Sequence, residues 1–239
     1  MFLRRLSFLN ERIRSPQVYP FSIPAFAGLD FIEFTSSVTF FVGENGSGKS
    51  TLLEAIAHKC EFNPAGGGRN NFYETPSSEA ALGDFIRLSW APKVTNGFFL
   101  RAESLFNFAA HIDNLGPEAY AAYGGKSLHD QSHGESFLSI FLNRFGKKGI
   151  YLLDEPEAAL SPARQLSLLR IIWELEREGK SQFIIATHSP IILAYPGAQL
   201  LDFDTSPLSQ TAYEDTAHYQ ITKGFMENRE LYLRKLFAE

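Results

Sequence analysis

The sequence of 239 residues is poor in cysteine and contains no long apolar run. Its single cysteine, Cys60, excludes any intrachain disulfide and favours a reducing compartment. No apolar run approaches the roughly 18 residues that a membrane-spanning helix needs. Residues 1–14 contain four arginines in place of the uninterrupted apolar segment of a signal peptide. We therefore expect a cytoplasmic protein without direct membrane insertion.

The chain also lacks an excess of basic residues, since its formal net charge is −5. This balance argues against a protein that binds nucleic acid over its whole surface, and it leaves a local basic patch open. We expect the arginines of residues 1–14, and a second cluster at residues 144–148, to lie on a solvated surface. With 44% hydrophobic and 21% charged residues, the chain predicts one globular domain over residues 1–239.

A glycine-rich segment between a strand and a helix is the clearest motif. Gly43, four further residues and then Gly48-Lys49-Ser50 satisfy G-x-x-x-x-G-K-[ST]. The preceding residues 38–42 are β-branched or aromatic, as in a buried strand, and residues 50–59 have helical spacing. This setting is the one that the phosphate-binding loop of nucleoside triphosphatases requires.

Such a loop points successive backbone N–H groups at phosphate oxygens, beside the positive end of a helix. Lys49 is expected to reach the terminal phosphates, and the Ser50 hydroxyl to bind Mg²⁺. The candidate nucleotide contacts in this segment are Gly43, Glu44, Asn45, Gly46, Ser47, Gly48, Lys49, Ser50 and Thr51.

Two further strands end in polar side chains. The apolar run at residues 150–153 leads into Asp154 and Glu155, and the run at residues 183–187 leads into His188. Ligands of open α/β sheets bind at the carboxyl ends of the strands. Asp154 is therefore the expected second ligand of Mg²⁺. Glu155 is the expected base that orients or deprotonates water, and His188 a contact of the terminal phosphate.

The remaining pattern predicts an α/β fold with a mainly parallel sheet covered by helices on both faces, and an antiparallel part. We expect an edge strand within residues 1–14, a hairpin of strands 85–90 and 98–101, and a surface loop at 63–71. Residues 163–178 predict an amphipathic helix. For the helix at 227–237 we favour packing on its own domain over docking to a partner.

These motifs together resemble the ATP-binding-cassette (ABC) ATPases, in particular the branch of RecF-like and structural-maintenance-of-chromosomes ATPases. Gly43 to Ser50 resemble Walker A, residues 151–155 Walker B, and His188 the switch histidine. Residues 132–135 resemble the signature motif, within a helical subdomain at about 103–146. The resemblance implies a P-loop fold, ATP and Mg²⁺ as ligands, and ATP hydrolysis. Tyr19, 24 residues before Gly43, is a candidate for stacking on adenine, with packing against its own domain as the alternative.

In that family two subunits sandwich two nucleotides, so the resemblance implies an ATP-dependent homodimer. Ser132 and Gly134 would then contact the nucleotide bound to the other subunit. The chain departs from the family pattern because no glutamine lies between Leu52 and Asp130. By position, Arg101 or Glu103 would stand in for it.

Three functions follow from the resemblance. The first is an ATPase that dimerises on ATP and acts as a switch on a protein partner or a nucleic acid. The alternatives are the nucleotide-binding subunit of an ABC transporter, and the ATPase component of a DNA repair or phage-defence system. The sequence does not name the partner.

Overall fold

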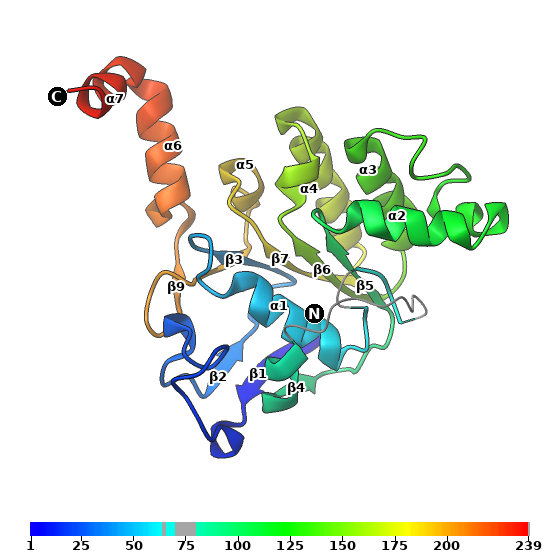
Figure 1. The fold of residues 1–239 in the computed structure, drawn as a ribbon, viewed down its shortest axis with the longest axis horizontal. Helices are drawn as coiled ribbons and strands as arrows, with labels where there is room; N and C mark the ends of the chain where they lie inside the picture. Colours follow the sequence, from blue (N-terminus) through cyan, green and yellow to red (C-terminus); the bar gives the residue numbers. More distant parts are fainter. Residues whose placement is uncertain (64–65, 70–79, 239) are drawn as a thin grey trace.

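The computed structural model describes residues 1–63, 66–69 and 80–238 (Figure 1). The strands are β1 (Leu3–Phe8), β2 (Phe31–Glu33), β3 (Val38–Val42), β4 (Ile86–Trp90), β5 (Gly97–Arg101), β6 (Gly149–Asp154), β7 (Ser181–Ala186), β8 (Gln199–Asp202) and β9 (Ser209–Thr211). The α-helices are α1 (Lys49–Lys59), α2 (Leu105–Asn114), α3 (His133–Arg144), α4 (Pro162–Arg177), α5 (Pro190–Leu193), α6 (Ala217–Glu227) and α7 (Arg229–Leu236). The short 3-10 helices are η1 (Asn10–Arg12), η2 (Pro24–Phe26), η3 (Ala80–Phe85), η4 (Pro117–Tyr123), η5 (Pro156–Ala159) and η6 (Tyr213–Asp215).

The main sheet has the strand order β5-β6-β7-β3-β8-β9 in the described part of the chain. All of its neighbouring pairs are parallel except β8 with β9. Every residue of β3, β6 and β7 is buried, because helices cover both faces. One core cluster includes α1, and the other includes α2, α3 and α4. The predicted α/β fold with a mainly parallel sheet is therefore confirmed.

A second, antiparallel sheet has the order β2-β1-β4 among the described strands. The predicted edge strand at the N-terminus is wrong, because β1 is the central strand of this sheet. Its two arginines, Arg4 and Arg5, do face solvent, since the apolar residues of β1 pack inward against the core.

The predicted hairpin of residues 85–90 and 98–101 is also wrong. Strand β4 pairs with β1 in the small sheet, whereas β5 pairs with β6 in the main sheet. The physical difference lies in burial: β4 exposes alternate residues, whereas Phe98, Phe99 and Leu100 of β5 are all buried. Such a continuous apolar run belongs in a sheet that is covered on both faces.

The predicted surface loop at 63–71 lies partly outside the described residues. Its described part is buried, and Gly67 exchanges two backbone hydrogen bonds with Phe99 of β5. The C-terminal helix does not pack on its own domain as expected. Helices α6 and α7 have no buried residue and project from the core beyond β9 (Figure 1).

No helix in the described ranges is long and apolar enough to cross a bilayer.

Candidate functional site

The glycine-rich loop joins β3 to α1 and depends on glycine geometry. Gly43, Gly46 and Gly48 have φ values of 146°, 80° and 106°, a region that side chains other than glycine rarely adopt. A Cβ atom on Gly48 would also lie 2.8 Å from Cγ2 of Ile23. The loop is anchored by Asp204, whose Oδ1 accepts a 2.8 Å hydrogen bond from the backbone N–H of Glu44.

Lys49 at the start of α1 lies within this loop. Its Nζ donates hydrogen bonds to the backbone oxygens of Gly43 at 2.7 Å and Glu44 at 2.8 Å. Only 4% of Lys49 is exposed, and this burial lowers the pKa of its ammonium group. The buried Oγ of Ser47 has no hydrogen-bond partner among the described residues. The loop therefore holds an ammonium group and an unpaired hydroxyl that a phosphate could engage.

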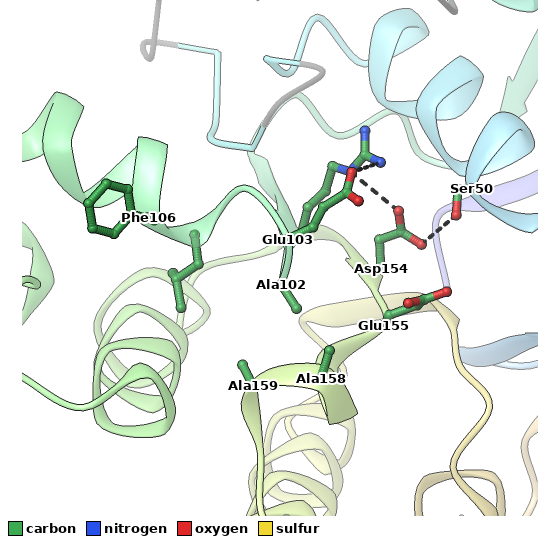
Figure 2. Close-up of a pocket in the computed structure, with 10 residues that line it drawn as sticks. Ser50, Ala102, Glu103, Phe106, Asp154, Glu155, Ala158 and Ala159 are labelled. Carbon is green, nitrogen blue, oxygen red and sulfur yellow. Dashed lines mark hydrogen bonds and ion pairs between the residues drawn. The ribbon is translucent and has the colours of Figure 1, made fainter.

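Ser50 and Asp154 meet next to the loop, as the sequence predicted for a metal site. The Ser50 hydroxyl donates to Asp154 Oδ1 at 3.0 Å (Figure 2). Burial raises the pKa of Asp154 to about 6, against the opposing effects of the nearby Arg101 guanidinium and of the Ser50 hydrogen bond. Two hard oxygen donors fit Mg²⁺, which takes few protein ligands and completes its shell with phosphate and water. In the described chain no cluster of three or more His, Cys, Asp or Glu side chains offers a complete metal cage.

Arg101 and Glu103 are the two predicted stand-ins for the missing glutamine, and Arg101 lies next to the acidic end of β6. Its Nε lies 3.4 Å from Asp154 Oδ2, and its other nitrogens pair with Glu54 and Glu103. The Glu103 side chain is 73% exposed and lies at the rim of a cavity of about 330 Å³ beside Asp154 and Glu155 (Figure 2). Of the two candidates, Arg101 is thus the one that reaches the acidic strand end.

Glu155 has the unusual backbone of the site. Its φ and ψ of 48° and 53° lie in the left-handed region, which costs a non-glycine residue on the order of 1–3 kcal/mol. Its backbone N–H is held by the carbonyl of Ala186 at the end of β7. The side chain remains 43% exposed, and its Oε1 lies 3.4 Å from Nε2 of His188. The fold therefore holds a carboxylate in a strained position beside His188.

The loop that carries His188 is fixed by Glu157, a residue that the sequence analysis missed. The Glu157 carboxylate accepts hydrogen bonds from Thr187 Oγ1 at 2.8 Å and from the backbone N–H of His188 at 2.5 Å. Burial raises the pKa of Glu157. The only sequence signal was a third acid directly after Asp154-Glu155-Pro156. The buried Nε2 of His188 itself makes no hydrogen bond of acceptable geometry to any described residue.

Ser132 and Gly134 lie at the N-terminus of α3. Ser132 is the N-cap of that helix: its backbone N–H and its hydroxyl both donate to Glu135 Oε2, at 2.9 and 2.7 Å. Arg164 of α4 approaches both Ser132 Oγ, at 3.3 Å, and Glu135 Oε1, at 3.6 Å. Helix α3 packs into the core cluster on one face of the main sheet, and α1 into the cluster on the other. The helix that follows residues 132–135 and the helix that follows the phosphate loop thus pack into different core clusters.

Tyr19 lies beside the phosphate-loop helix. Its hydroxyl is 3.1 Å from Thr51 Oγ1, and 51% of the residue is exposed. An exposed ring near α1 is consistent with a nucleotide contact, and stacking on adenine stays a prediction.

Comparison with known proteins identifies the class of this site. Residues 22–83 match a family model described as "AAA domain", and residues 136–194 match one described as "AAA domain, putative AbiEii toxin, Type IV TA system". The thiamine import ATP-binding protein ThiQ of Chelativorans sp. is 29% identical over 67% of this chain and 70% of that protein. The hemin import ATP-binding protein HmuV of Nocardia farcinica is 30% identical over 70% of this chain, which spans 63% of that protein.

These matches support an ABC-type or AAA ATPase. The fold of the chain agrees with this assignment, because a metal-chelate type ABC transporter solved in an inward-facing conformation superposes with a TM-score of 0.51 at 15% identity, covering 93% of this chain and 88% of that one. The nucleotide-binding character of this ABC-type ATPase thus rests on both the comparisons and the loop between β3 and α1.

Proposed function

We propose that this ABC-type ATPase binds ATP and Mg²⁺, dimerises on them and acts as a switch on a protein partner or a nucleic acid. The observation that carries the proposal is the convergence of four groups at one sheet edge: Lys49, the pair of Ser50 and Asp154, Glu155, and His188. Three different strands, β3, β6 and β7, deliver these groups. An ATPase site needs a phosphate cradle, a metal ligand and a base for water, all of which this arrangement supplies.

In this proposal Lys49 exchanges the carbonyls of Gly43 and Glu44 for phosphate oxygens. Ser50 and Asp154 would hold Mg²⁺, which would supply positive charge to neutralise that of the phosphates. Glu155 orients the attacking water and accepts its proton. The Nε2–H of His188 donates to the terminal phosphate. Lys49 Nζ bonds in the structure to two backbone oxygens, which phosphate oxygens would replace.

The dimer part of the proposal rests on Ser132 and Gly134. Gly134 is buried against Arg164, while Ser132 is exposed at the positive end of α3. Because α3 and α1 pack into different core clusters, these N-terminal amides would serve the nucleotide of a second subunit. Removal of the terminal phosphate would then release the two subunits from each other.

The solution mass of Glu155→Gln, measured by light scattering with and without Mg·ATP, tests this proposal. The amide keeps the shape of Glu155 but cannot accept the proton of water, so ATP should persist and trap a dimer of twice the 26.8 kDa monomer. A matched control is Lys49→Met, which should bind ATP weakly and stay monomeric. A monomer that demonstrably binds ATP, or wild-type turnover in Glu155→Gln, would contradict the proposed roles.

The nucleotide-binding subunit of a transporter is the second candidate, because the curated relatives are ATP-binding proteins of importers. The missing glutamine, together with Ser132-His133-Gly134-Glu135 in place of the residues usual in the signature of transporters, argues against this candidate. We therefore rank this candidate below the switch. Co-purification of the tagged wild-type chain with an integral membrane protein would reverse the ranking.

A further inference from the structure

The C-terminal arm, defined here as α6 and α7 together (residues 217–236), is attached to the core by a narrow base. Thr216 precedes α6, is 2% exposed and caps the helix. Beyond it no residue of α6 or α7 is buried, and the arm projects away from the sheets (Figure 1). Met226 is 78% exposed at the end of α6. The contacts at the start of α6 therefore determine how firmly the arm is held against the core.

At that base one side chain of α6 reaches the nucleotide site. His218 Nε2 lies 3.2 Å from His188 Nδ1 and 3.4 Å from the backbone oxygen of Gly43. The two imidazole rings meet edge to face, with centroids 4.9 Å apart. His218 thus contacts both the first residue of the phosphate loop and His188, and neither the motif search nor the family resemblance pointed to it.

The hydrogen-bond partners of His218 indicate which of its ring nitrogens carries the proton. A backbone oxygen only accepts hydrogen bonds, so Nε2 of His218 carries hydrogen when it contacts Gly43. His188 Nδ1 then accepts from the same N–H, which places the proton of a neutral His188 on Nε2. Burial, and next the charge of Lys49, lower the pKa of His188, in agreement with a neutral ring. The resulting Nε2–H lies 3.4 Å from Glu155 Oε1 and makes no hydrogen bond of acceptable geometry to any described residue.

Gly43 links this contact to the state of the site. Its carbonyl oxygen accepts from Lys49 Nζ at 2.7 Å as well as from His218 Nε2 at 3.4 Å. When Lys49 turns to the phosphates of a bound nucleotide, this oxygen loses its stronger donor and becomes free to bind His218 more closely. The N–H of His218 would then replace the ammonium group of Lys49 as the donor to the buried carbonyl oxygen of Gly43. This oxygen would therefore keep a hydrogen-bond partner.

We propose that His218 is a positioning residue of this ATPase, which holds His188 with Nε2–H directed into the site and couples nucleotide binding to the C-terminal arm. The inference rests on the proposed function, because it assumes that Lys49 and His188 engage the phosphates of ATP. It predicts a direction: the arm becomes more firmly held when Mg·ATP is bound, and looser after hydrolysis. The arm would then report the nucleotide state to whatever the switch acts on.

A fluorophore on the arm measures this coupling. The substitution Met226→Cys offers an exposed thiol, whereas the native Cys60 is 5% exposed and burial raises its pKa to about 12, so labelling is selective. In the Glu155→Gln background, Mg·ATP should raise the fluorescence anisotropy of the label beyond the rise expected from dimer mass alone. Adding His218→Ala should abolish that excess, and His218→Gln, which keeps an N–H donor, should restore it.

The control on the same helix is Ile221→Ala, since Ile221 is 58% exposed and its loss should leave the excess unchanged. With Glu155 intact, His218→Ala should lower kcat about 10- to 100-fold with KM within twofold, because a mispositioned group costs rate rather than binding. His218→Gln should recover most of kcat.

The outcomes separate the two proposals. If the labelled Glu155→Gln protein fails to bind Mg·ATP, the proposed function fails and this inference with it. If it binds ATP and dimerises but His218→Ala keeps the full anisotropy response, the coupling through His218 is refuted while the proposed function stands. Equal kcat losses in the Ala and Gln variants would refute the positioning role of the N–H donor.

Discussion

The buried carboxylate of Asp154 lowers the folding stability of the ligand-free protein, and the substitution Asp154→Asn measures the size of this effect. The pKa of Asp154 rises from 3.8 to about 6 because the group is buried at the end of β6. A difference of about two pKa units corresponds to about 3 kcal/mol of folding free energy. Since the folded-state pKa is the higher one, this stability is fully present below about pH 4 and is lost as the pH rises through 6.

The asparagine variant carries no such pH-dependent cost and still offers an oxygen to the Ser50 hydroxyl. We expect the ligand-free variant to unfold at higher urea concentration than the wild type at about pH 7.5. The wild type has already lost about half of this stability at pH 5, so the advantage of the asparagine variant should grow by about 1–2 kcal/mol between about pH 5 and pH 7.5. Arg101 keeps Glu54 and Glu103 as partners in the variant.

The control is Asp215→Asn, which removes a carboxylate that is exposed in η6 and should change stability little at either pH. With saturating Mg·ATP the order should reverse, because only the wild type gains the free energy of metal and nucleotide binding. An advantage of Asp154→Asn that does not change with pH, or a loss of stability at both values, would refute the reasoning from burial.

Two more predictions test the loop and the dimer. Gly48→Ala should lower Tm and nucleotide affinity together, because its Cβ meets Ile23 at 2.8 Å and its φ of 106° is strained; Gly46→Ala meets no atom within 4 Å and should show the smaller, conformational cost alone, of about 1–2 kcal/mol. Ser132→Ala and Lys49→Met should each be inactive as homodimers, and mixing them should restore turnover, since one composite site of the mixed dimer is intact. Mixtures that stay inactive while both variants fold would count against a site completed by the second subunit.

The local parts of the site could be predicted from the sequence because each follows directly from a strand. The phosphate loop follows β3, Asp154 ends β6, and His188 follows β7. Parallel neighbouring strands bring their carboxyl ends to one edge of the sheet, so the contact of Ser50 with Asp154 follows from topology alone.

Pairing between strands could not be predicted in the same way. The turn residues between β4 and β5 are those of a hairpin, and local turn chemistry favoured that pairing. The continuous apolar run of Phe98, Phe99 and Leu100, all buried in β5, was the stronger signal, because such a run requires covering layers on both faces of its sheet. Where a local turn signal and a burial pattern disagree, tertiary packing determines the pairing of the strands. The burial of a strand's side chains contributes several kcal/mol to the free energy of folding, whereas a turn contributes about 1 kcal/mol.

The roles of Glu157 and His218 could not be predicted from the sequence, because each side chain contacts a backbone group that is far away along the chain. Glu157 is significant through the N–H of His188, 31 residues away, and His218 through the carbonyl of Gly43, 175 residues away. Neither contact uses a motif spacing, and histidine in a polar helix is ordinary. Both residues contact His188, whose Nε2 lies 3.4 Å from Glu155 Oε1. His188 is thus held from two sides, by the carboxylate of Glu157 at its backbone and by His218 on the projecting arm. The second of these supports is the one that can transmit a change of nucleotide out of the core.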